Sequence, residues 1–192
     1  MSYKVAIFID FNNMLWDYQN SFKSGTHSQI PERAWQNFNY GIFFLLSVLF
    51  KNPIIKFSHV FSHVVYSVSN ESKRTKGAML FSRKMKKIFS EPGFLINELP
   101  RKRGTKSESG VDIFLACNML TGAKKDFYDI AVLASRDNDF IPVVEMVQNK
   151  YFKKVIQLAY FNEKSEFPFL RSVCYGNIDL GDLDNEFKIK SK

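Results

Sequence analysis

The hydrophobic and polar positions along the chain follow two periods, which predict strands that alternate with helices. Short runs of β-branched and aromatic residues are typical of buried strands. We expect such strands at residues 4–10, 59–68, 94–99, 130–134 and 155–159. Apolar residues at helical spacing predict helices that begin at Pro31 and that span 78–90, 111–123 and 141–148. This order predicts an α/β fold with a mostly parallel central sheet and helices on both faces.

The chain length fits one domain, which we place at residues 1–178, followed by a charged tail at 179–192. The longest apolar run, 42-IFFLLSVLF-50, is far shorter than the roughly 20 residues that a membrane span needs. No secretory signal is visible, and two cysteines, Cys117 and Cys174, are too few for a disulfide framework. We therefore expect a cytoplasmic protein without a membrane span. Cys117, on a predicted helix, is expected to be a small buried apolar residue.

The positive charge is unevenly distributed along the chain. The net charge is +8, and basic residues gather at 73–76, 83–87 and 101–106. One such cluster is also typical of a solvated helix face, but three clusters close together favour a nucleic-acid surface.

Four aspartates are placed where the predicted fold would bring them together. Asp10 ends the first strand, Asp137 and Asp139 follow the strand at 130–134, and Asp112 begins the helix after a basic loop. The carboxyl ends of parallel strands meet at one edge of a sheet, so we expect these carboxylates to converge. Clustered carboxylates repel one another unless a cation lies among them, and Mg²⁺ or Mn²⁺ prefers oxygen ligands. Together with the basic loops, this favours metal-dependent cleavage of a nucleic acid.

Each of these residues also has a purely structural interpretation. Asp112 could favour a helix N-terminus, Asp139 could cap the helix at 141–148, and Asn13 could satisfy turn amides. Asp10 is harder to explain in this way, because aspartate is poorly suited to continuing a strand. The presence of Asp10, Asn13, Asp137 and Asp139 together therefore favours a functional site over separate structural roles.

Three stretches in order, 9-IDFNN-13, 110-GVDIFLACNM-119 and 129-DIAVLASRDNDFIPVV-144, resemble the NYN domain, a branch of the PIN-like nuclease superfamily. The resemblance implies a Rossmann-like α/β/α sandwich and an acidic pocket for Mg²⁺ or Mn²⁺, with cleavage of RNA as the usual activity. Tyr66 resembles an aromatic residue often found at the end of the second strand. The positions that match the family's catalytic and metal-binding acids are Asp10, Asp112, Asp137 and Asp139, accompanied by Asn13 and Ser135.

Two positions depart from the family pattern. Asn118 stands where a second acid of the helix is usual, and its carbonyl can ligate a metal or hold a metal-bound water but adds no charge. Arg136 stands where glycine is usual. Its guanidinium, if directed into the pocket, would stabilise ionised Asp137 and Asp139 and partly substitute for the metal; directed outward, it could bind a phosphate.

Two functional hypotheses follow. The first is a divalent-metal-dependent endoribonuclease, a hydrolase acting on single-stranded RNA, with Phe81 and Phe94 as stacking surfaces. The alternative is a catalytically impaired RNA-binding or partner-binding module on the same fold. The sequence leaves open whether the chain binds a second copy of itself or a regulatory protein. A nucleotide-binding Rossmann domain is disfavoured, because neither GxGxxG nor a Walker lysine pattern occurs. The basic residues expected to bind RNA are Lys73, Arg74, Lys76, Arg101, Lys102, Arg103, Lys106 and Arg136.

Overall fold

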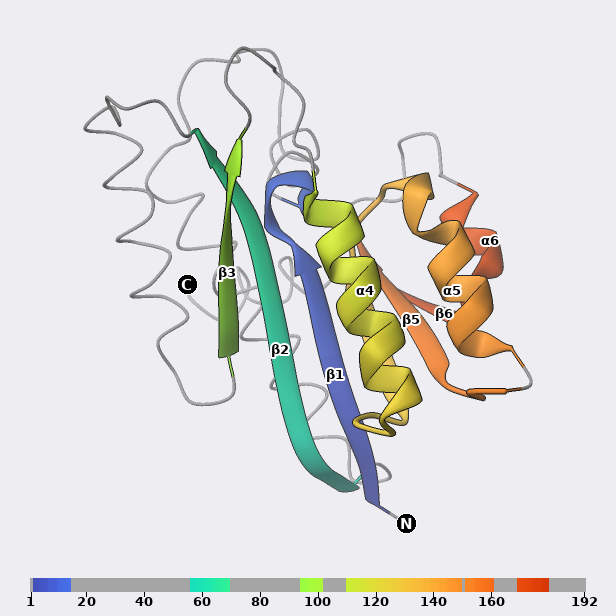
Figure 1. The fold of residues 1–192 in the computed structure, drawn as a ribbon. Helices are drawn as coiled ribbons and strands as arrows, with labels where there is room; N and C mark the ends of the chain where they lie inside the picture. The colour runs from blue at the N-terminus through green and yellow to red at the C-terminus, as the bar shows by residue number, and fades with distance from the viewer. Residues whose placement is uncertain are drawn as a thin grey trace, which may run out of the picture.

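Six parallel strands form one sheet among the described residues, and their order fixes where a site can lie (Figure 1). The strands are β1 (Ser2–Asp10), β2 (Lys56–Ser69), β3 (Phe94–Arg101), β4 (Ile130–Ala134), β5 (Val155–Tyr160) and β6 (Gly176–Asp179). Their spatial order is β3-β2-β1-β4-β5-β6, and every neighbouring pair is parallel. This is the doubly wound Rossmann order, in which the direction of winding reverses between β1 and β4. The α/β fold with a parallel sheet is therefore confirmed.

The computed structural model describes residues 2–14, 56–69, 94–101, 110–149, 151–160 and 169–179, with backbone alone for 56–69 and 94–101. The helices expected from Pro31 and at 78–90 lie outside these residues, as do Phe81, the basic cluster at 73–76 and the tail beyond Asp179. For Tyr66 and Phe94 only the backbone position in β2 and β3 is given.

A helical turn at residues 11–14 follows β1. The other helical elements within the described residues are α4 (Val111–Lys124), the short 3-10 helix η1 (Asn138–Phe140), α5 (Ile141–Gln148) and α6 (Leu170–Val173). The strand expected at 130–134 and the helix expected at 141–148 have these bounds in the structure. Sequence patterns predict no element after residue 159, yet α6 and β6 lie there. Both are only four residues long, which is too short for a period to be recognised. None of the helices within the described ranges is long and apolar enough to cross a membrane.

The central strands are buried on both faces, as their continuous apolar runs predict. On β1, Ala6 and Phe8 face a core shared with α4 and α5, while Val5, Ile7 and Ile9 on the opposite face are also no more than 2% exposed. Figure 1 shows α4 and α5 side by side over one face of the sheet. Burial of this kind keeps β1 and β4 rigid, so that residues at their ends have fixed positions.

Helix α4 packs through one stripe of side chains, and Cys117 lies away from that stripe. The buried residues of the helix are Val111, Leu115, Met119, Gly122 and Ala123. Cys117 is exposed, so the expectation that it is buried is wrong. At 100° per residue it points away from the buried stripe.

The buried ring of Tyr128 lies against the end of α4. Its hydroxyl donates to the carbonyl oxygen of Met119 at 2.7 Å, and its ring meets that of Phe8 edge to face. A Cβ atom at Gly122 would lie 2.8 Å from Cε1 of Tyr128, so only glycine allows this close approach. Burial raises the pKa of the Tyr128 hydroxyl well above its usual value, which keeps it a neutral donor.

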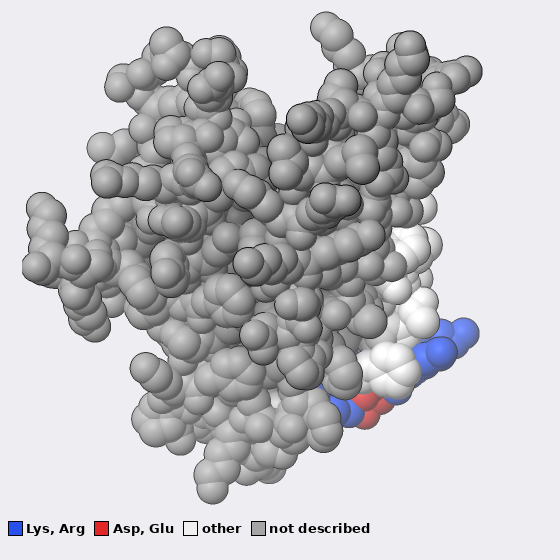
Figure 2. Space-filling model, turned by 90° about the vertical axis from the view of Figure 1, so that its left-hand side faces the viewer, with Lys and Arg blue, Asp and Glu red and all other residues white. Residues whose placement is uncertain are grey.

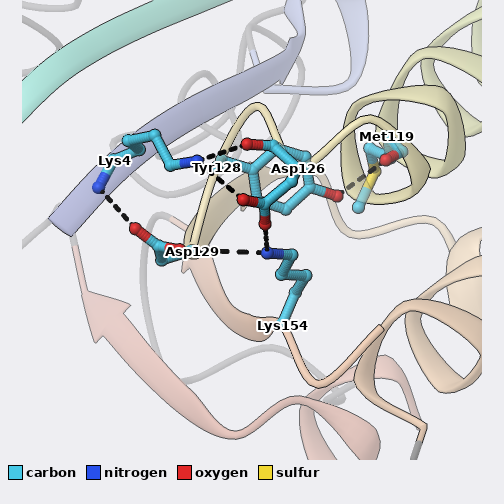
Figure 3. A network of polar contacts seen from close by, with 6 residues as sticks. All are labelled: Lys4, Met119, Asp126, Tyr128, Asp129 and Lys154. Carbon is cyan, nitrogen blue, oxygen red and sulfur yellow. Dashed lines mark hydrogen bonds and ion pairs between the residues drawn. The ribbon is translucent and has the colours of Figure 1, made fainter. Parts of the chain in front are cut away.

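A network of charged groups joins the amino ends of β1, β4 and β5 (Figure 3). The ammonium groups of Lys4 and Lys154 both bind the carboxylate of Asp126, and Lys154 also lies 3.8 Å from Oδ1 of Asp129. The amide of Lys4 donates to Oδ2 of Asp129 at 2.8 Å. Hydrogen bonds from Lys154 and then Lys4 are the main reason that the pKa of Asp126 falls from 3.8 to about 2. These acids therefore have a structural role at the edge opposite to the candidate site.

Candidate active site

Two strand ends create the centre of the candidate site. Ile9 of β1 pairs with Ala134 of β4, so Asp10 and Ser135 leave the sheet side by side. Asp10 is 3% exposed and Ser135 is fully buried. The hydroxyl of Ser135 lies 3.5 Å from Oδ2 of Asp10, as a donor at the limit of a hydrogen bond. The pair lies where the winding direction reverses, the place at which open α/β sheets bind ligands.

Asn13 connects the end of β1 to the loop after β4. Residues 11–14 form a helical turn directly after β1, with Phe11 and Met14 fully buried. The turn directs the amide of Asn13 to Oδ1 of Asp10 at 3.2 Å, while Oδ1 of Asn13 accepts a hydrogen bond from the amide of Arg136 at 3.0 Å. Asn13 thus satisfies a backbone amide, as its structural interpretation requires. That amide lies 123 positions away along the chain, in the loop that follows β4 and carries Asp137 and Asp139, here called the acidic loop.

The loop after β4 continues the same line of polar contacts towards the surface. The amide of Asp137 donates to the hydroxyl of Ser135 at 3.2 Å, and the amide of Asp139 donates to Oδ1 of Asp137 at 2.9 Å. Asp137 is therefore the N-cap of η1. The structural interpretation of Asp139 as a cap is wrong, because Asp137 has that role and α5 begins without a side-chain cap. Asp139 is exposed and Asp137 half-buried, so burial decreases from Asp10 outward.

Helix α4 carries the two remaining predicted site residues, and they lie at different positions along the helix axis. The helix begins after Gly110, whose φ of 100° suits glycine, and it contacts both β1 and η1. Asp112 is half-buried in its first turn, at the carboxyl edge of the sheet. Asn118 lies about 9 Å farther along the axis. Its Nδ2 donates to the carbonyl oxygen of Phe114 at 2.8 Å, which is a contact within the helix.

The carboxylates of the candidate site suit a hard divalent cation that binds few protein ligands. Carboxylate oxygens are what Mg²⁺ and Mn²⁺ prefer, and Mg²⁺ usually binds one or two carboxylates and several waters. Across the described ranges, no group of three or more His, Cys, Asp or Glu side chains is arranged to hold a metal ion. The residues therefore fit a site with one or two carboxylate ligands, rather than one formed by all four aspartates.

The predicted RNA-binding residues are only partly within the described structure. Arg136 is half-buried in the acidic loop, and Arg101 is the last residue of β3, described by its backbone. On the face shown in Figure 2, the described surface carries Lys or Arg directly beside Asp or Glu. Outside the described residues lie Lys73, Arg74, Lys76, Lys102, Arg103 and Lys106.

One segment beside the site is absent from the sequence prediction. Oδ1 of Asn138, between the two loop aspartates, accepts a hydrogen bond from the amide of Leu170 at 3.1 Å, which places α6 against η1. Leu170 is fully buried, while Phe169 before it is 77% exposed. Apolar residues at 170, 173 and 174 have the i, i+3, i+4 spacing of a helix, but this spacing covers little more than one turn and is too short to predict the segment from the sequence. Burial raises the pKa of the nearby Cys174 thiol to about 12, which disfavours the reactive thiolate form.

Comparison with known proteins gives a family and a structural neighbour. A family model described as NYN domain matches residues 4–181. A solved structure of a Vibrio parahaemolyticus protein of unknown function is similar at 17% identity, with a TM-score of 0.61 and 93% of each chain covered. At this identity the likeness concerns the fold alone. No curated protein matches the chain.

Proposed function

Because the chain belongs to the NYN domain family, a branch of the PIN-like nucleases, we propose that it is a divalent-metal-dependent endoribonuclease that hydrolyses single-stranded RNA. The observation that supports this best is the hydrogen-bonded line from buried Asp10 through Ser135 and Asp137 to exposed Asp139. It runs from the interior to the surface at the switch point of the sheet, the place at which open α/β sheets bind ligands, and its outer end at Asp139 is exposed to solvent.

The carboxylates have different tasks in this proposal. One or two of the carboxylates of Asp10, Asp137 and Asp139 would bind Mg²⁺ or Mn²⁺ directly, and the others, with Asp112 at the same edge of the sheet, would orient waters around the ion. When bound, such an ion lowers the pKa of its water and neutralises charge that develops on the phosphodiester. Ser135 and Asn13 hold the acids in place, since the first donates to Asp10 and accepts from the amide of Asp137, and the second accepts from the loop amide of Arg136.

The test compares purified wild-type protein with Asp10→Asn and Asp139→Asn variants on labelled single-stranded RNA with Mn²⁺. Each variant keeps the side-chain shape but loses a charge, so we expect the cleavage rate to fall by about 100-fold or more. Glu145→Gln is the matched control, because Glu145 is exposed on α5 outside the acidic loop; its rate should equal that of wild type. Equal cleavage by all four proteins would assign the activity to a different site or to a contaminant.

A second candidate function is a binding module that keeps the fold without catalysis. Two observations favour it: no group of three acids suited to a metal forms within the described residues, and the Asn118 amide is engaged in its own helix. Calorimetric titration with Mn²⁺ separates the candidates. Heat and thermal stabilisation at millimolar Mn²⁺ support the nuclease, whereas RNA binding that ignores EDTA, without any metal response, supports the module. A large gain in metal affinity in Asn118→Asp would also point to a partly disabled site.

A further inference from the structure

An exposed aromatic residue, Phe169, has its backbone beside the acidic loop. Phe169 is 77% exposed, although large apolar side chains gain by leaving water. The next residue, Leu170, donates its amide to the side chain of Asn138 at 3.1 Å. Asn138 lies between Asp137 and Asp139, so the backbone of Phe169 is fixed next to the loop that carries two of the candidate metal ligands.

The segment that carries Phe169 is anchored from several sides. Leu170 is fully buried in the core, and the side chain of Gln148 on α5 donates to the carbonyl oxygen of Val173 at 2.7 Å. The guanidinium carbon of Arg171 lies 5.8 Å from the centre of the Tyr160 ring at the carboxyl end of β5. The hydroxyl of Ser172 donates to the carbonyl oxygen of Phe169 itself at 2.6 Å. A solvent-exposed ring on a fixed backbone loses little freedom when it binds a flat ligand.

We propose that Phe169 is a stacking platform for a base of single-stranded RNA, next to the phosphate held at the acidic site. The proposal rests on the proposed function and adds a substrate subsite to it. Bases of any sequence present a flat face, and stacking on an aromatic side chain is the usual way in which proteins hold single strands without reading sequence. Arg171 adds a positive charge in α6, the short helix that follows Phe169, which suits the RNA backbone.

The experiment measures binding of a labelled single-stranded RNA by fluorescence anisotropy in EDTA, so that affinity is measured without cleavage. We expect Phe169→Ala to raise Kd about 5- to 100-fold and Phe169→Trp to leave it near that of wild type. Tyr175→Ala is the matched control. Tyr175 is also 77% exposed, but its amide binds the carbonyl oxygen of Ile156 near the amino end of β5, away from the acidic loop.

An abasic strand of the same length shows whether the effect comes from bases. Wild type and Phe169→Ala should bind that strand with equal affinity, because stacking needs a base. Two results would refute the subsite while leaving the nuclease proposal in place. In the first, Phe169→Ala binds intact RNA as tightly as wild type; in the second, its affinity for intact RNA and its affinity for the abasic strand fall by the same factor. If wild type neither binds nor cleaves RNA, both proposals are refuted. If Phe169 matters for binding and no cleavage occurs, the subsite is supported and the nuclease is not.

Discussion

Single residues at the candidate site combine a structural task with a chemical one. Asp137 caps η1 through one oxygen and borders the site, and Asn13 accepts an amide hydrogen bond while holding the acidic loop against β1. From the sequence alone, the structural role and the role in the site are alternatives for each residue, but a side chain with several acceptor sites can have both roles. A capping role is therefore no argument against a role in the site.

The hydroxyl of Tyr128 should contribute measurably to stability. We expect Tyr128→Phe to lower the free energy of unfolding by about 1 kcal/mol, because it removes a buried hydrogen bond to the carbonyl oxygen of Met119. Urea denaturation measures the change. The control is Tyr175→Phe at a 77% exposed ring, which should change stability by less than about 0.5 kcal/mol. Equal effects of the two substitutions would contradict the assignment.

At the level of elements, the two edges of the sheet use their acids differently. At the amino edge, Asp126 and Asp129 are neutralised by Lys4 and Lys154, which fixes the ends of three strands. At the carboxyl edge, the acids are joined through amides and a hydroxyl. The acids at the amino edge, which already have lysine partners, are therefore poor metal ligands.

The amino-edge network should make stability depend on pH in acid. Hydrogen bonds from Lys154 and Lys4 lower the pKa of Asp126 from its ordinary value of 3.8 to about 2 in the folded protein. Because the folded pKa is the lower one, the ionised carboxylate stabilises the fold above pH 3.8, and this contribution is lost as the pH falls towards 2. Thermal unfolding of wild type and Asp126→Asn checks this. The wild type should have the higher Tm near pH 6, and the difference should shrink between about pH 4 and pH 2.

Asparagine is the appropriate substitution at this position. The φ of Asp126 is 57°, in the left-handed region that asparagine tolerates better than most residues, so backbone strain should not change. A Tm difference that stays constant from pH 6 to pH 2 would show that the ion pairs with Lys4 and Lys154 contribute nothing.

For the whole molecule, the strand order and the net charge of +8 together suggest how a polyanion would bind. The sheet places Asp10 and Ser135 at its winding reversal, and β3, which ends at Arg101, leads into the basic cluster at 101–106. RNA would then contact this cluster on its way to the acidic edge.

This arrangement predicts a steep dependence of RNA affinity on salt. The plot of log K against log salt should have a slope of about −0.7 for each phosphate contact. Replacing Arg101, Lys102, Arg103 and Lys106 by alanine should make the slope less steep by about 3. Lys124→Gln with Lys125→Gln, at the opposite end of α4, is the control and should leave the slope unchanged. An unchanged slope in the first variant would place the RNA elsewhere.

The sequence by itself determined the strands β1 to β5 and the helices α4 and α5 that alternate with the last of them, since long apolar periods depend only on neighbouring residues. It also indicated that Asp10 and the loop after β4 share one edge, because parallel strands end together. Only the tertiary structure decided that Asp137 and not Asp139 is the cap, that Cys117 is exposed, and that α6 and Phe169 lie beside the acidic loop. These facts depend on contacts between distant segments, such as Asn138 with Leu170, which no local period encodes.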